Sequence, residues 1–262
     1  HKADENTMPL EIVTVPCLTD NYAFLLHEKV SGQTAVVDAP DAKPILSVLA
    51  ERGWSLDHIL ITHHHDDHIM GVAELQTATG ASVHGGAPDA YRLPNLDTQL
   101  ADGDTFRLGA ENCRVIDVSG HTLGHIAFIF DSQLAAFTAD SLMAWGCGRV
   151  FEGTMEMQWA TMQKFHDLPR AMAIYSGHEY TTSNGKFALT IEPDNESYKD
   201  RMAATEAARA KGEPTVPSNL GLELATNPFL RASHPKVKEA LGMRDATDVE
   251  VFVEIRTRKD SF

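Results

Sequence analysis

The sequence predicts a layered α/β domain followed by a smaller helical domain. Short strand signals alternate with helix signals over the first two-thirds of the 262 residues, whereas helix signals dominate after about residue 180. Hydrophobic residues make up 43% of the chain and charged residues 23%, the balance of an ordinary globular protein. A chain of this length and composition can bury a core without disulfides.

The strand predictions rest on short stretches that are rich in Val, Ile and Phe and are flanked by Gly, Asp or Asn. They cover residues 12–15, 23–27, 34–38, 58–62, 82–84, 105–108, 114–118, 126–130, 134–138 and 171–176. Helices are expected over residues 42–52 and 68–79, which Gly53 and Gly80 end, and over residues 155–168. This alternation is typical of an α/β domain, which we expect over residues 8–180.

The remaining residues, 181–262, predict the helical domain. Asn195 is expected to cap a helix that continues to residue 211 and ends at Gly212, before a proline-containing loop over residues 213–218. Further helices are expected over residues 235–241 and 247–256, the second with Val249, Phe252, Val253 and Arg256 on one face. Residues 1–7 are polar and precede Met8, so we interpret them as a remnant of an expression vector.

Charge and composition narrow the classes of partner. The net charge of −15 argues against nucleic acid and against an anionic membrane surface. No apolar run approaches the ~20 residues of a membrane span. Cys17, Cys113 and Cys147 are far apart and odd in number, which favours buried thiols in a reducing compartment. We therefore expect a cytoplasmic protein, and nothing in the sequence suggests more than a monomer.

A cluster of metal-ligand side chains follows the expected strand 58–62. The segment reads Leu60-Ile61-Thr62-His63-His64-His65-Asp66-Asp67-His68. Alternate residues of an extended chain point the same way, so His63 and His65 can share one metal while Asp67 and His68 serve a second. An accidental His-rich loop or a tag remnant is the alternative. A tag would lie at a terminus and lack the interspersed Asp residues.

Four ligands are too few for two metals, and three further candidates follow expected strands. They are His121, Asp140 and His178, each at a junction of strand and loop. Asp140 is the natural bridging carboxylate. Imidazoles with a few carboxylates favour two zinc ions and tolerate iron or manganese. His64 and Asp66 are not expected to be ligands, and structural roles are expected for His27, His58, His84, His166 and His234.

These residues resemble the metal motif of the metallo-β-lactamase superfamily, and their context resembles the glyoxalase II (hydroxyacylglutathione hydrolase) family within it. The similarity includes residues 18–22 (Leu-Thr-Asp-Asn-Tyr), 146–149 (Gly-Cys-Gly-Arg), 151–154 (Phe-Glu-Gly-Thr), 177–181 (Gly-His-Glu-Tyr-Thr), 213–218 (Glu-Pro-Thr-Val-Pro-Ser) and 227–229 (Asn-Pro-Phe). It runs from about Leu10 to the C-terminus. The metal motif marks the superfamily, and the later motifs are more specific to the family.

The resemblance implies an αββα sandwich with a C-terminal helical domain that binds glutathione. It implies one metal on His63, His65 and His121, a second on Asp67, His68 and His178, and a bridging Asp140. It further implies hydrolysis of S-D-lactoylglutathione to D-lactate and glutathione, the second step of methylglyoxal detoxification. The glutathione contacts would come from Arg149, Tyr180, Arg256 and Lys259, with Asn184 as a further contact.

Three departures from the family pattern affect the expected site. Phe151 stands at a substrate-contacting position where some relatives carry a tyrosine, so that hydrogen bond would be absent. Ala139 stands where glycine is usual before Asp140, and Asp66 adds a carboxylate beside the metals.

The expected mechanism is attack of a metal-bridging hydroxide on the thioester, with Asp67 and Asp140 as the catalytic carboxylates.

Other members of the superfamily supply the alternatives. A glutathione persulfide dioxygenase would need one iron and no second metal site, and a lactonase would not need the basic C-terminal residues. A catalytically silent metal-binding module is a third alternative, against which the complete ligand set argues.

Overall fold

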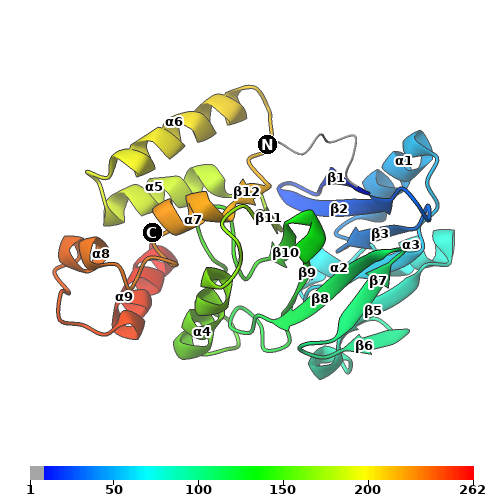
Figure 1. Cartoon of the computed structure of the whole chain (residues 1–262), viewed down its shortest axis with the longest axis horizontal. Coiled ribbons are helices and arrows are strands. Elements are labelled where there is room, and N and C mark those ends of the chain that lie inside the picture. Colours follow the sequence, from blue (N-terminus) through cyan, green and yellow to red (C-terminus); the bar gives the residue numbers. More distant parts are fainter. Residues whose placement is uncertain (1–8) are drawn as a thin grey trace. The chain divides into compact units, whose positions relative to one another are not determined.

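The structure, a computed structural model, describes residues 9–262 (Figure 1). The chain divides into two compact units. The proposed vector remnant, residues 1–7, lies outside the described residues. Unit 1 contains the residues up to Val118 together with Leu123–Phe137, and unit 2 contains Ser119–Thr122 together with Thr138–Phe262. This division differs from the domain boundary at residue 180, which stays a prediction.

The first sheet belongs to unit 1 and is built from the N-terminal strands. These are β1 (Leu10–Cys17), β2 (Asn21–Glu28), β3 (Thr34–Val37), β4 (His58–Leu60), β5 (Ser82–Gly86) and β6 (Thr98–Leu100), hydrogen-bonded in that order. The pairs β1–β2 and β2–β3 are antiparallel, and the pairs from β3 to β6 are parallel. The parallel strands bring the carboxyl ends of β3, β4 and β5 to one edge, where the His/Asp motif follows β4.

Helices cover one face of this sheet. Helix α1 (Ala42–Arg52) contributes Ile45 and Leu49, and α3 (Val72–Thr79) contributes Val72 and Leu75, to a buried cluster with strand residues such as Val36. Asp41 caps α1 by accepting from the backbone N–H of Lys43. The short α2 (Asp66–Ile69) contains the end of the His/Asp motif.

The second sheet has the order β12-β11-β10-β9-β8-β7. Its strands are β7 (Thr105–Leu108), β8 (Glu111–Asp117), β9 (Ile126–Phe130), β10 (Ala135–Ala139), β11 (Ala173–Ser176) and β12 (Ser218–Asn219). Strand β10 contributes residues to both units. Within unit 1 the two sheets pack face to face, with the rings of Phe24 and Phe137 5.7 Å apart and those of His58 and Phe106 5.0 Å apart.

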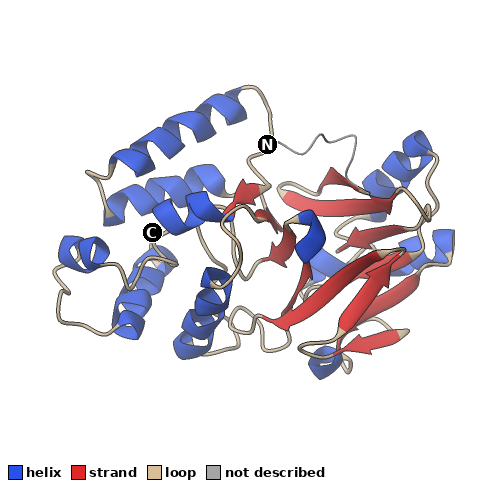
Figure 2. Cartoon of the chain, in the orientation of Figure 1, coloured by secondary structure: helices blue, strands red, loops and turns tan. Residues whose placement is uncertain are grey.

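Helices dominate unit 2 (Figure 2). They are α4 (Met155–His166), α5 (Thr181–Ile191), α6 (Glu196–Ala210), α7 (Leu220–Thr226), α8 (Pro235–Ala240) and α9 (Asp248–Asp260). Trp145, Ala188, Tyr198 and Met202 form a buried cluster that joins α5 to α6. A buried ion pair between Arg201 and Glu223, at 2.7 Å, joins α6 to α7.

Several predicted elements differ from the observed ones. The helix predicted over residues 68–79 is two helices, because Gly71 lies against the backbone of the residues before α1 and its N–H donates to Ala39. The helices α5 and α7 and the strands β6 and β12 were not predicted. In α9 the fully buried side chains are Val251, Phe252, Ile255 and Arg256, whereas Val249 and Val253, predicted on one face with Phe252 and Arg256, are half-buried.

Two further expectations concern the whole chain. None of the helices within residues 9–262 is long and apolar enough to cross a membrane. All three cysteines are buried and free, as the sequence predicted. Burial raises the pKa of each thiol, and that of Cys17 reaches about 11, which keeps the groups protonated and unreactive at neutral pH.

Candidate metal centre and substrate site

The His/Asp motif begins directly after β4, where the buried strand delivers the chain to the sheet edge. His63 and His68 are almost completely buried, whereas His65 and Asp67 are partly exposed. The ring centroid of His63 lies 4.9 Å from that of His65 and 4.2 Å from that of His68, and Nε2 of His68 lies 3.5 Å from the Asp67 carboxylate. The first half of the predicted ligand set is therefore gathered in unit 1.

Asp38, at the end of β3, organises this half-site. One carboxylate oxygen accepts from the backbone N–H of Thr62 at 2.8 Å. The other lies 2.7 Å from the Thr62 hydroxyl and 2.8 Å from Nδ1 of His68. Asp38 thus fixes both the strand end that precedes the motif and the ring of a predicted metal ligand.

These contacts also set the tautomers of two histidines. The Thr62 hydroxyl donates its hydrogen bond to Asp38, so the hydroxyl oxygen accepts a hydrogen bond from Nδ1 of His63, at 2.9 Å. Nδ1 of His68 likewise donates to the Asp38 carboxylate. Each ring therefore carries its proton on Nδ1, and Nε2 keeps the lone pair that a metal requires.

Two further side chains support the motif. The Asn21 amide, at the start of β2, donates to both the backbone carbonyl and the carboxylate of Asp67, each at 3.0 Å. The fully buried ring of His125 stacks on His63, with centroids 4.3 Å apart and an interplanar angle of 11°. Both residues restrict the orientation of predicted ligands without belonging to the predicted set.

The second half of the ligand set lies in unit 2. Nε2 of His121 is 3.5 Å from one carboxylate oxygen of Asp140, and Nε2 of His178 is 3.3 Å from the other. Nδ1 of His121 donates to the carbonyl of Arg149 at 2.6 Å, so its Nε2 also keeps a lone pair. The ring of His178 stacks on Tyr180 at 4.6 Å. The two imidazoles thus converge on one carboxylate, as a shared bridging ligand requires.

The backbone around Asp140 is tightly packed. Ala139 has a φ of 45°, in the left-handed region that favours glycine. A side chain at Gly148 would lie 2.3 Å from the carbonyl oxygen of Asp140 and 2.7 Å from Nδ1 of His121, so only glycine fits there. The segment from Gly148 to Arg149 therefore lies directly against two predicted ligands.

The basic residues predicted to bind glutathione gather at the end of α9. Arg149 is half-exposed, and Arg256 is only 4% exposed. The Arg256 guanidinium donates to the carbonyl of Cys147 and to the carboxylate of Asp260, and it lies over the ring of Phe229. Lys259 lies over Phe187 and Phe262, and burial, followed by the charge of Arg256, lowers its pKa.

The other predicted substrate contacts occupy different surroundings. Phe151 is exposed and packs edge-on against His121 at 5.4 Å. The Asn184 amide is buried and donates to the carbonyl of Ala144, so this side chain already supports the loop before Cys147. Tyr180, which stacks on His178, remains partly exposed. The assignments of all these side chains to substrate binding stay predictions.

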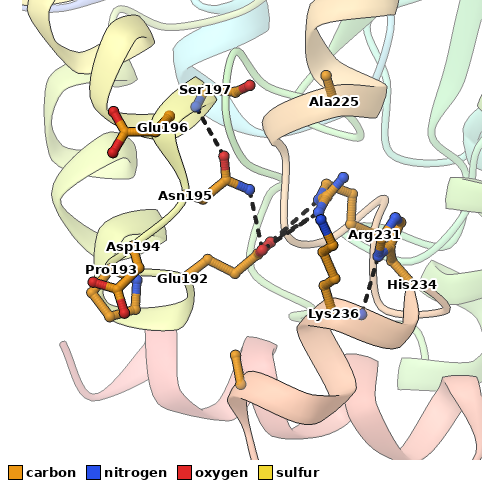
Figure 3. Close-up of a pocket in the computed structure, with 11 residues that line it drawn as sticks. Glu192, Pro193, Asp194, Asn195, Glu196, Ser197, Ala225, Arg231, His234 and Lys236 are labelled. Carbon is orange, nitrogen blue, oxygen red and sulfur yellow. Dashed lines mark hydrogen bonds and ion pairs between the residues drawn. The ribbon is translucent and has the colours of Figure 1, made fainter.

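A separate open pocket of about 620 Å³ lies at the start of α6 (Figure 3). Two of its charged groups bind one another: Arg231 pairs with Glu192 at 3.1 Å, and Glu192 also accepts from the Asn195 amide. None of the residues predicted to bind glutathione lines it. We therefore interpret this network as a structural tie between α6 and the segment before α8.

Sequence reasoning missed Asp38, Asn21 and His125 as parts of the site. Asp38 and His125 lie at strand boundaries, where single polar residues are common. Asn21 belongs to the Leu18–Tyr22 motif that carried the family resemblance, which was the available signal for a role at the metal motif. For the other two residues, only the three-dimensional contacts show the role.

Both parts of the chain match known protein families. The family model of the metallo-beta-lactamase superfamily matches residues 24–178, and the model of the hydroxyacylglutathione hydrolase C-terminus matches residues 179–262. The fold of two sheets flanked by helices, and the His/Asp groups at its strand ends, are those of the metallo-beta-lactamase superfamily.

Curated relatives show which family of the superfamily the chain belongs to. A hydroxyacylglutathione hydrolase from Cereibacter sphaeroides is 59% identical over 97% of this chain and all of its own. Others from Roseobacter denitrificans and Methylococcus capsulatus are 54% and 50% identical, each over 97% of this chain and 100% and 99% of their own. The chain belongs to the hydroxyacylglutathione hydrolase family.

Solved structures support the fold at lower identity. ETHE1 from Myxococcus xanthus is 22% identical, with a TM-score of 0.66 over 97% of this chain and 92% of its own. The BLEG-1 B3 metallo-beta-lactamase is 18% identical, with a TM-score of 0.64 over 84% of this chain and 99% of its own. At these identities the likeness concerns the fold alone.

Proposed function

We propose that this protein is a hydroxyacylglutathione hydrolase that cleaves S-D-lactoylglutathione to glutathione and D-lactate. Its relatives carry that name at up to 59% identity over nearly the whole chain. The observation that carries the proposal is the combination of a His/Asp ligand set with a basic cluster at the end of α9, within one family. The His/Asp ligand set suits metal-assisted hydrolysis, and the basic cluster suits the binding of an anionic thiol such as glutathione.

The proposed centre would hold two metal ions on two sets of side chains that share Asp140. The first set would be His63, His65, His121 and Asp140, and the second would be Asp67, His68, Asp140 and His178, the two groups whose residue types suit a metal ion. The donor set fits divalent cations, because neutral imidazoles present Nε2 and the carboxylates supply negative charge. We propose zinc as the metal, with iron or manganese as substitutes.

When bound, the metal ions activate water at neutral pH and polarise the thioester carbonyl. The chain supplies the orientation of their ligands. Asp38 and the Arg149 carbonyl fix the rings of His68 and His121, and Asn21 holds the Asp67 carboxylate in one rotamer. Asp67 and Asp140 are the proposed catalytic carboxylates.

The leaving group requires little help from the protein. A thiolate whose thiol has a pKa near 8.5 is a stable leaving group, so no dedicated general acid is needed. Glutathione carries carboxylates, and the cluster of Arg149, Arg256 and Lys259 concentrates positive charge on a chain of net charge −15. Tyr180 and Asn184 complete the proposed glutathione contacts, and Phe151 offers a ring face without a hydroxyl.

The physiological setting belongs to the same proposal. The three free buried cysteines fit a reducing compartment, and we place the protein in the cytoplasm. The substrate is a small molecule, and the strong negative charge disfavours nucleic acid as a partner. We propose that the chain acts as a monomer.

The test is hydrolysis of S-D-lactoylglutathione by the zinc-loaded protein, with an acyl-coenzyme A and a simple lactone alongside. We expect strong preference for the glutathione thioester. Equal or greater activity on the lactone would contradict the proposed substrate. Consumption of oxygen and glutathione persulfide by a form with one iron per chain, without thioester hydrolysis, would replace the proposal with dioxygenase chemistry.

A further inference from the structure

Asp260, the last residue of α9, lies between two arginines of the basic cluster. Its Oδ1 atom is 3.3 Å from Nε of Arg149. The same oxygen accepts from Nε and Nη2 of Arg256 at 3.2 Å and 3.0 Å. Its backbone carbonyl accepts from Nη2 of Arg149 at 3.1 Å. One residue therefore binds both guanidinium groups.

The same contacts tie the segment 147–149 to α9. Arg256 donates to the carbonyl of Cys147 at 2.6 Å, while Arg149 reaches in the opposite direction to Asp260. The carbonyl of Arg149 also accepts from Nδ1 of the predicted ligand His121. Arg149 thus touches a metal ligand through its backbone and α9 through its side chain.

We propose that Asp260 is a positioning residue that, anchored by the buried Arg256, holds Arg149 ready for the carboxylates of glutathione. The inference rests on the proposed function and deepens it. Arg149 is half-exposed, and its long side chain would lose conformational entropy on binding substrate if nothing held it beforehand. The Asp260 contacts supply that order in advance.

The charge of the cluster leaves room for an anionic ligand. Arg149, Arg256 and Lys259 carry three positive charges and Asp260 one negative charge, so two positive charges remain uncompensated within this group. Burial and the charge of Arg256 lower the pKa of Lys259, which an added carboxylate would reverse. Asp260 orients the cluster without neutralising it.

The test compares Asp260→Ala with the wild type on two substrates. We expect the KM for S-D-lactoylglutathione to rise about tenfold while kcat changes less than about twofold, because the lost interaction concerns binding of the glutathione half. The kcat/KM for S-lactoyl-N-acetylcysteamine, which lacks the carboxylates, should stay unchanged. Asp260→Asn should restore part of the KM, because its amide oxygen still accepts from both arginines.

The matched control is Glu254→Ala, which removes an exposed carboxylate of the same helix that pairs with Arg258 at 2.8 Å. Its kinetic constants should equal those of the wild type. A lower KM in Asp260→Ala would overturn the inference, because the carboxylate would then compete with substrate. Parallel losses on both substrates, or no change, would overturn it too.

Failure of the proposed function has a different signature. It would appear as absence of S-D-lactoylglutathione hydrolysis by the wild type. In that case calorimetric binding of glutathione itself still tests Asp260. Weaker binding to Asp260→Ala than to Glu254→Ala would support the inference, and equal binding would overturn it.

Discussion

At the scale of single residues, the metal motif depends on side chains that are not themselves predicted ligands. Asp38 binds the Thr62 hydroxyl and backbone as well as the His68 ring, so it determines where the motif starts and which nitrogen of His68 is available. Partners of this kind change metal affinity nearly as strongly as some ligands do.

We therefore predict that Asp38→Asn weakens metal binding. The amide keeps the shape and tolerates the φ of 60° at this position, but it loses the negative charge that faces His68. Metal affinity, measured by chelator competition, should fall about 10- to 100-fold. Asp41→Asn, a change of the same kind at the cap of α1, should leave it unchanged, and equal effects of the two would refute the role of Asp38.

Ala139 supports a second prediction at this scale. Its φ of 45° costs an alanine energy that a glycine avoids, so Ala139→Gly should raise the free energy of unfolding by about 1 kcal/mol. Ala136→Gly, in the same buried strand, should lower it instead. Denaturant titrations of both variants check the opposite signs. A loss of stability in both would mean that the backbone of Ala139 is unstrained.

The sequence alone suggests the candidate ligands, because their residue types and spacing are rare outside metal sites, and the structure gathers those residues into groups that could hold a metal ion. The supporting residues could not, because Asp38 and His125 are single polar residues at strand boundaries. Arg256 illustrates a further limit. The family resemblance assigned it to glutathione binding, but only the structure shows that the side chain is buried against Cys147 and Phe229.

At the scale of elements, tertiary packing decides where the weak helices form. Helix α5 contains Gly185 and β-branched residues, which lowers its intrinsic helix propensity and explains why sequence reasoning missed it. Phe187, Ala188 and Ile191 are buried, so packing stabilises the helix. At Gly71 the sequence predicted one continuous helix, whereas the structure interrupts it there because the backbone of Gly71 lies in close contact with another backbone segment.

We predict that Gly185→Ala destabilises the protein although alanine favours helices. The new methyl group would lie 2.4 Å from a ring carbon of the buried Trp145. The free energy of unfolding should fall by about 1–3 kcal/mol through overpacking. Lys186→Ala, at the exposed neighbouring position of α5, should change it by less than about 0.5 kcal/mol. Unchanged stability of Gly185→Ala in urea titrations would show that Trp145 can move.

At the scale of the whole molecule, the buried His84 and its half-buried neighbour His58 make the stability of the fold sensitive to pH. Nδ1 of His58 lies 3.1 Å from Nε2 of His84, and both rings pack against Phe106. Burial, followed by the charge of His58, lowers the pKa of His84 from 6.5 to about 4. Burial also lowers the pKa of His58. The structural roles predicted for these residues fit this packing.

The sign of the pH effect follows from proton uptake. Between pH 6.5 and about 4 the unfolded chain binds a proton at His84 that the folded chain does not, so stability falls as pH falls through this range. From pH 7.5 to 5 the contribution of His84 is about 2 kcal/mol. His84→Phe should reduce the pH dependence of the unfolding free energy by that amount. Equal pH dependence of the unfolding free energy in the wild type and in His84→Phe would refute the proposed contribution of His84.

The fold class and the helical second part were predictable because composition and periodicity change near residue 180. The exact division was not, because β10 contributes to both compact units and no composition change marks it. The proposed function requires both halves of the predicted ligand set to act together, which is the central claim.

The measurement that tests this claim most directly is hydrolysis of S-D-lactoylglutathione by metal-free protein as zinc is added back in known equivalents. We predict that activity rises until two equivalents per chain are bound, and that Asp140→Ala loses metal and activity together. Full activity at one equivalent, or an active and fully metallated Asp140→Ala, would contradict a shared two-metal centre.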